Sequence, residues 1–146
     1  MEDETKARIL IIEDDPGFRD LLRLHLSASG YKVRVAEDGV AGGRAILADP
    51  PDLIISDIDM PFLDGLELLS LLRTEESTGS IPVILLSGRG DSDTLVKAVD
   101  AGAADYLIKP VTRDRLLESV EACLARARGG NASTDQGSAS PGKEPA

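Results

Sequence analysis

The sequence predicts an α/β domain in which helices cover both faces of a parallel sheet. Five short apolar stretches alternate along the chain with five stretches of helical periodicity. This alternation is typical of repeated strand–helix–strand units, whose strands are buried on both faces. The chain has 146 residues, and 42% of them are hydrophobic. It is therefore long enough for one domain with an aliphatic core.

The five strands are predicted from apolar runs that are too short to be helices. They lie at residues 8–12, 32–36, 53–57, 83–87 and 105–108. Four of these runs consist mainly of Ile, Leu and Val, as expected for strands covered on both faces. The exception is K-V-R-V-A at residues 32–36, where apolar and polar residues alternate. Alternation of this kind is typical of a half-exposed edge strand.

The five helices are predicted from apolar residues that recur at helical spacing. They cover residues 16–29, 40–49, 65–76, 92–101 and 113–127. Their ends carry suitable capping residues. Asp15 precedes Pro16, a residue favoured in the first helical turn, and Thr112 precedes the last helix. Gly30 and Gly102 follow helix ends, where glycine is common.

The edge character of residues 32–36 also indicates the order of the strands. It favours the flavodoxin-like, doubly wound order 2-1-3-4-5, in which the first and third strands are neighbours. We expect a flexible N-terminus at residues 1–7, the domain at residues 8–128 and a disordered tail at residues 129–146. The tail has no large apolar residue, so it cannot bury enough surface to offset its ordering entropy.

The charge and hydropathy of the chain exclude several classes of function. The formal net charge is −10, and we therefore expect no direct contact with nucleic acid, which requires a basic footprint. No apolar run is long enough for a membrane span, and the first residues do not resemble a signal peptide. We expect a cytoplasmic protein without membrane insertion. The single cysteine, Cys123, is expected to be a core residue.

Reactive side chains end four of the five predicted strands. Glu13 and Asp14 follow the first, Asp57 ends the third, Ser87 ends the fourth and Lys109 follows the fifth. The carboxyl ends of parallel strands meet at one edge, so these groups should lie together. Two like charges about 4 Å apart repel by roughly 4 kcal/mol at an effective dielectric constant of ~20. Three neighbouring carboxylates therefore require a cation, and their oxygen ligands favour Mg²⁺.

This set of groups predicts a site for a phosphoryl group. A divalent cation and Lys109 would neutralise phosphoryl oxygens, and the Ser87 hydroxyl would donate to one of them. Asp57 is central among the reactive groups, so we expect it to be the acceptor.

Four motifs resemble those of the receiver domain of two-component response regulators, in particular stand-alone receivers of the chemotaxis-regulator type. They are I-L-I-I-E-D-D-P-G-F-R, D-L-I-I-S-D-I-D-M-P-F-L-D-G, P-V-I-L-L-S-G and G-A-A-D-Y-L-I-K-P. They occur in the family's order, and the resemblance covers residues 8–127. It implies a protein that accepts a phosphoryl group from a sensor histidine kinase or a histidine phosphotransfer protein.

The resemblance also implies a role for each residue of the site. Asp57 is the phosphorylated residue. Asp14 binds Mg²⁺ directly, Glu13 does so through water, and the backbone carbonyl of Asp59 completes the protein ligands. The Asp59 and Arg89 side chains flank the site.

Three further positions are implied to respond to phosphorylation. Ser87 contacts the phosphoryl group and moves on activation, Lys109 pairs with it, and Tyr106 is the aromatic switch. Such a protein is not an enzyme of metabolism. It catalyses only its own phosphorylation and slow dephosphorylation, and it signals to a downstream protein. We expect a stand-alone receiver, with a fragment of a longer protein as the alternative.

Two other functions are compatible with parts of this pattern. Asp57-Ile58-Asp59 resembles the D-x-D motif of phosphatases of the haloacid dehalogenase type. That motif normally lies on the first strand, and this chain has no cap domain. The second alternative is a receiver-like scaffold that binds partners without being phosphorylated.

Overall fold

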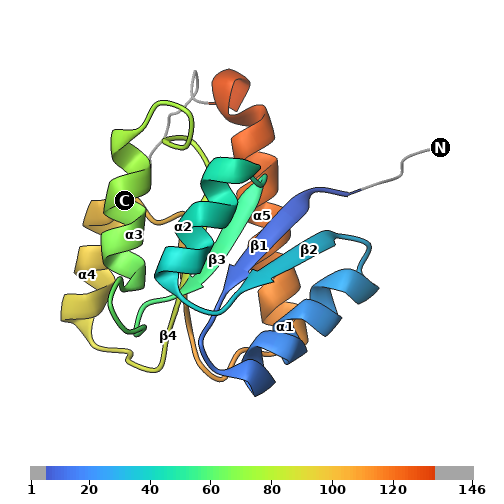
Figure 1. Cartoon of the computed structure of the whole chain (residues 1–146). Helices are drawn as coiled ribbons and strands as arrows, with labels where there is room; N and C mark the ends of the chain where they lie inside the picture. Colours follow the sequence, from blue (N-terminus) through green and yellow to red (C-terminus); the bar gives the residue numbers. More distant parts are fainter. Residues whose placement is uncertain (1–5, 134–146) are drawn as a thin grey trace.

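Within residues 6–133, five parallel strands and five helices alternate, as predicted (Figure 1). This computed structural model describes residues 6–133. The strands are β1 (Arg8–Ile12), β2 (Lys32–Ala36), β3 (Leu53–Asp57), β4 (Val83–Ser87) and β5 (Asp105–Ile108). The helices are α1 (Pro16–Ala28), α2 (Gly39–Ala48), α3 (Gly65–Thr74), α4 (Ser92–Ala101) and α5 (Arg113–Ser133).

The strands form one sheet in the order β2-β1-β3-β4-β5, which confirms the flavodoxin-like topology. β3 is therefore the central strand, with β1 and β4 as its neighbours. Its register aligns Ser56 with Ile12 of β1 and Asp57 with Leu86 of β4. The residues that follow β1 and β4 consequently lie on either side of Asp57. In Figure 1 the arrowheads of β1 and β3 point to the same edge of the sheet.

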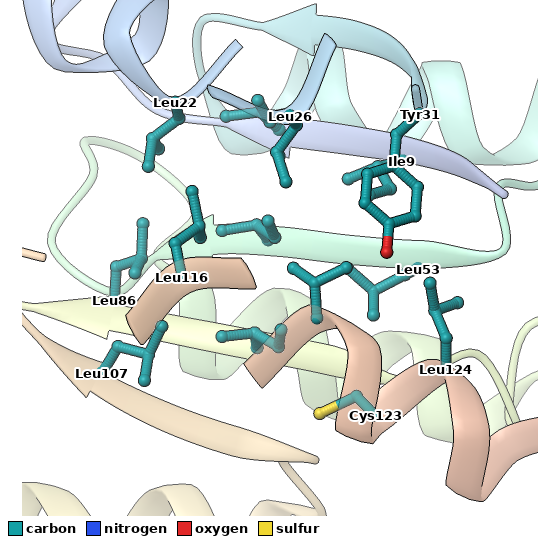
Figure 2. Close-up of a cluster of buried hydrophobic side chains, with 14 residues drawn as sticks. Ile9, Leu22, Leu26, Tyr31, Leu53, Leu86, Leu107, Leu116, Cys123 and Leu124 are labelled. Atoms are coloured by element: carbon teal, nitrogen blue, oxygen red, sulfur yellow. The ribbon is translucent and has the colours of Figure 1, made fainter. Parts of the chain in front are cut away.

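One face of the sheet is covered by α1 and α5. Figure 2 shows their side chains packed on those of four strands, with Leu22 and Leu26 from α1 and Leu116 from α5. Cys123 is buried in this cluster, as expected for a core residue. These buried side chains hold α1 on this face of the sheet.

The other face is covered by α2, α3 and α4. The buried side chains there include Ile46 from α2, Leu69 from α3 and Ala98 from α4. They pack on Leu10 and Ile54, whose side chains alternate with those that face α1 and α5. Burial on both faces explains why β1, β3 and β4 are almost continuous apolar runs. β2 is half exposed, as predicted for an edge strand.

Side chains just before four of the helices fix where those helices begin. Asp15, Asp38, Asp64 and Asp91 each accept a hydrogen bond from a backbone N–H in the first turn of the following helix. Thr112 does the same for α5. Asp38 explains why α2 begins at Gly39 rather than at residue 40.

The last helix is longer than composition indicates. The predicted boundary between domain and tail lies at residue 129, whereas α5 continues to Ser133. A helix can extend past its last buried residue because each added residue continues the backbone hydrogen-bond ladder. The rest of the predicted tail, 134–146, and residues 1–5 of the predicted N-terminal segment lie outside the described residues. Within residues 6–133, no helix combines the length and the apolarity that a membrane crossing needs.

Two adjacent glycines of α2 provide a test of this packing. A methyl group added at Gly42 would lie 2.4 Å from Cδ1 of Ile12, which is fully buried, whereas one at Gly43 would meet nothing within 4 Å. Gly43→Ala should stabilise the protein by about 0.5–1 kcal/mol, because alanine is the better helix former. Gly42→Ala should destabilise it by about 1–3 kcal/mol through overpacking. Urea unfolding of both variants measures this difference, and equal effects would contradict the packing of α2 on β1.

Candidate functional site

The predicted reactive residues lie at the carboxyl edge of the sheet, at the ends of the four consecutive strands β1, β3, β4 and β5. Glu13 follows β1, Asp57 ends β3, Ser87 ends β4 and Lys109 follows β5. The strand register places Glu13 and Asp57 side by side, because Ile12 is aligned with Ser56. The apolar strand pattern thus determines which polar groups meet.

Three carboxylates form a cluster at this edge. Glu13, Asp14 and Asp57 each present one oxygen atom, and these atoms lie within 4.8 Å of one another. Glu13 is completely buried and Asp57 is 4% exposed, whereas Asp14 is exposed. The cluster therefore has a buried floor and one side open to solvent. Carboxylate oxygens without His or Cys form a donor set that fits Mg²⁺ rather than Zn²⁺.

Lys109 contacts both buried carboxylates. Its Nζ atom lies 3.0 Å from Oε1 of Glu13 and 3.3 Å from Oδ2 of Asp57. The other oxygen of Glu13 accepts a hydrogen bond from the backbone N–H of Asp15. One ammonium group faces three carboxylates, so two negative charges in the cluster remain uncompensated. A divalent cation would supply the missing charge.

The pKa shifts at this edge come mainly from burial. Burial raises the pKa of Asp57, and the nearby Lys109 offsets only part of the effect. Burial likewise raises the pKa of Glu13, against the hydrogen bond from Asp15 and the pull of Lys109. Burial disfavours the charged form of Lys109, but its contacts with Glu13 and Asp57 outweigh burial and raise its pKa. The two buried acids share the single positive charge of Lys109, whereas Lys109 has two negative neighbours.

Ser87 and Tyr106 are linked through one residue of the β4–α4 loop. The backbone N–H of Arg89 donates to Oγ of the fully buried Ser87 at 2.9 Å. The hydroxyl of the half-buried Tyr106 donates to the carbonyl of Arg89 at 2.5 Å. A shift of Ser87 would therefore move the partner of Tyr106.

The side chain of Asp59 is not one of the three carboxylates of the acidic cluster. It is half exposed and forms an ion pair with the guanidinium group of Arg89. This pair closes a link between the β3–α3 loop and the β4–α4 loop. The sequence indicates that both residues flank the site but does not predict that they pair.

Two residues of the site carry no signal of this role in the sequence. The ring of Phe18 lies under Lys109, with its centroid 4.8 Å from Nζ. Gly65 lets α3 begin close to the end of β3, because an added methyl group would lie 2.4 Å from the carbonyl oxygen of Asp57. An apolar residue in a first helical turn predicts core packing, and a glycine after Asp64 predicts a turn. Only the folded structure shows which residues Phe18 and Gly65 contact.

Comparisons with known proteins agree with this geometry. A family model described as "Response regulator receiver domain" matches residues 9–121. Response regulator MprA from Mycobacterium ulcerans is 43% identical over 123 residues, which are 84% of this chain and 52% of that protein. A putative response regulator from Chloroflexus aurantiacus has a solved structure with a TM-score of 0.80 and 34% identity. That match covers 84% of this chain and all of the other.

A further relative corrects the expectation that nucleic acid plays no part. RpaA from Synechocystis, a DNA-binding dual master transcriptional regulator, is 40% identical over 119 residues, which are 82% of this chain and 49% of RpaA. The prediction that the net charge of −10 excludes nucleic acid as a partner is therefore wrong for this family. The charge of one domain sets no limit on what other parts of a protein bind.

The chain spans about half the length of the curated relatives it matches. The resemblance is thus to their receiver portion, and it includes the strand ends that carry the acidic cluster. The family match, the sheet order and the site geometry lead to one conclusion: the chain belongs to the response regulator receiver domain family of two-component signalling systems.

Proposed function

We propose that Asp57 accepts the phosphoryl group in this receiver domain. The observation that carries the proposal is the contact of Lys109 with Asp57 inside the acidic cluster. Asp57 is almost completely buried, ends the central strand and has one oxygen held by the lysine. Glu13 is completely buried with both oxygens engaged, and Asp14 is exposed. Asp57 is therefore the carboxylate that has one oxygen beside the lysine and a second oxygen that the lysine does not contact.

We propose that Glu13, Asp14 and Asp57 hold Mg²⁺ together with the backbone carbonyl of Asp59. When bound, Mg²⁺ offsets the charge of the phosphoryl oxygens. The support is the donor set of oxygens alone and the two uncompensated negative charges of the cluster. The engagement of Asp59 with Arg89 involves only its side chain, so its carbonyl is not consumed by that pair.

The transfer follows from the positions of the protein groups. A carboxylate oxygen of Asp57 attacks the phosphorus of a phosphohistidine, a P–O bond forms, and the P–N bond to the imidazole breaks. The imidazole keeps the electron pair of that bond and takes up a proton. Lys109 lies beside Oδ2 of Asp57, so its ammonium group can follow the charge onto the new phosphoryl oxygens. The donor is a sensor histidine kinase or a histidine phosphotransfer protein.

The response to phosphorylation runs through Ser87 and Tyr106. The oxygen of Ser87 already accepts the Arg89 N–H, which leaves its own hydrogen free to donate to a phosphoryl oxygen. Movement of Ser87 toward the phosphoryl group would shift Arg89 and release the hydroxyl of Tyr106. The surface around Tyr106 then changes its affinity for a downstream partner. Because RpaA is a DNA-binding regulator, control of transcription is a candidate output.

The phosphatase alternative has less support. A D-x-D phosphatase needs its second acid near the phosphoryl group, whereas the side chain of Asp59 is paired with Arg89 outside the cluster. The charged groups of the site are all present, so an inert scaffold also has no specific observation in its favour.

Phosphorylation by acetyl phosphate tests the acceptor directly. With Mg²⁺ present, intact mass spectrometry should show the addition of one phosphoryl group to the protein. Asp57→Asn should abolish this addition, because an amide oxygen is a poor nucleophile. Asp59→Asn is the matched control, since it keeps the carbonyl and should still be phosphorylated. Equal labelling of Asp57→Asn and the parent protein would contradict the assignment.

Removing the charge of Asp57 should also stabilise the protein when no metal is present. Burial raises the pKa of Asp57 in the folded state. The protein therefore loses stability as pH rises from the ordinary pKa of an aspartate through the raised value. At neutral pH, Asp57→Asn should raise the unfolding free energy by about 1 kcal/mol, a Tm increase of roughly 2–5 °C.

Acid and Mg²⁺ provide the controls for this prediction. The difference in Tm should shrink below the pKa of Asp57, where the native carboxyl is neutral. Saturating Mg²⁺ should raise the Tm of the parent protein more than that of Asp57→Asn, because ligand binding stabilises only the folded state that holds the site. A Tm difference that neither pH nor Mg²⁺ alters would show that the charge of Asp57 is not its cause.

The switch can be followed because the chain has only two tyrosines, Tyr31 and Tyr106. Fluorotyrosine labelling should give two ¹⁹F signals, and phosphorylation should shift that of Tyr106. The signal of Tyr31, which is buried in the α1–α5 core, should stay in place. Ser87→Ala should keep phosphorylation but lose the Tyr106 shift, because the link through Arg89 is cut. A full shift in Ser87→Ala would refute the proposed route.

A further inference from the structure

We propose that Phe18 is a positioning residue that holds the ammonium group of Lys109 against Asp57. The inference rests on the proposed function, because it concerns how Lys109 is placed for the transfer. It starts from one contact, the 4.8 Å between Nζ of Lys109 and the centroid of the Phe18 ring. This is within the range in which a cation is attracted to the face of an aromatic ring.

The ring supplies a third side to the site of the ammonium group. Two sides are occupied by oxygens, Oε1 of Glu13 at 3.0 Å and Oδ2 of Asp57 at 3.3 Å. Both contacts are ion pairs, in which the positive ammonium group faces a negatively charged oxygen. The Phe18 ring adds an aromatic contact to these two ion pairs. The lysine side chain has several rotatable bonds, so a third contact restricts its freedom to swing into solvent.

Phe18 is itself tied to the acidic cluster by the first turn of α1. Its backbone N–H donates to Oδ2 of Asp15 at 2.8 Å, and the N–H of Asp15 donates to Oε2 of Glu13 at 3.1 Å. The contacts therefore form a closed circuit from Glu13 through Asp15, Phe18 and Lys109 back to Glu13.

The body of the ring is half buried against the α1–α5 core, so it is not free to turn away. The hydrogen bond that caps α1 therefore also fixes the position of the ring beside the lysine. The placement of Lys109 depends on α1 as well as on the two carboxylates.

This arrangement predicts a graded effect on phosphorylation by acetyl phosphate. Phe18→Leu keeps an apolar side chain in the core but removes the ring face, and it should slow phosphorylation of Asp57 about 2- to 10-fold. Phe18→Tyr keeps an aromatic face and should restore the rate to within about twofold of the parent. Phe62→Leu is the matched control. Phe62 is 93% exposed, so its loss should leave the rate unchanged.

Fluorinated phenylalanine at position 18 separates the charge of the ring from its shape. Successive fluorination weakens the attraction of the ring face for a cation while changing its volume little. The logarithm of the phosphorylation rate should fall steadily along the series, and the same series at Phe62 should be flat. A flat series at position 18, or an unchanged rate in Phe18→Leu, overturns the proposal.

An NMR measurement keeps this test separate from the proposed function. In the unphosphorylated protein, the ring current of Phe18 should shift the ε-methylene protons of Lys109 upfield, and Phe18→Leu should remove the shift. If acetyl phosphate fails to label even the parent protein, the proposed function fails, while the NMR shift still reports the contact. If labelling succeeds and the upfield shift is missing, Phe18 does not hold Lys109 and the inference fails alone.

Discussion

Repulsion between buried carboxylates is the interaction on which the rest of the site depends. Glu13 and Asp57 are both removed from water, and Asp14 lies beside them. One ammonium group, that of Lys109, cannot neutralise all three. The cluster therefore keeps a net negative charge, and burial, with a smaller contribution from repulsion, raises the pKa of both buried acids. A bound cation and a firmly held lysine both stabilise a site of this kind. The residues around the cluster favour both.

The fold favours cation binding and a fixed lysine because it brings rigid strands and helices to one edge of the sheet. The apolar strands β1 and β3 align Glu13 with Asp57, and Gly65 lets α3 begin close to the end of β3. The first turn of α1 connects Glu13 to Phe18, and through it to Lys109. The loop after β4 ties Ser87, Tyr106 and Asp59 to a single residue, Arg89. The charged groups lie at this edge of the sheet, and the loop after β4 can move when their charge changes.

The sequence was sufficient for the fold and for the strand-end residues, because both follow from periodicity. The carboxyl ends of parallel strands lie at one edge of the sheet, so the sequence alone predicts that Glu13 and Asp57 lie together. Contacts that depend on packing angles were not accessible: nothing in the chain indicates that Phe18 faces Lys109. The same holds for Arg89, which lies between two glycines in a loop without periodicity. The net charge led to a wrong conclusion about nucleic acid, because a sum over one domain does not describe a family whose members include a DNA-binding regulator.

The central claim is that the acidic cluster is a single cation site built around Asp57. A titration of the metal-free protein with Mg²⁺, followed by backbone amide NMR, tests it most directly. The account predicts one saturable site, with the largest shifts at residues 13–15, 57–59 and 109. Shifts that never saturate and spread over the many acidic groups of the surface would contradict it, because they would show that Mg²⁺ finds no site organised by the fold.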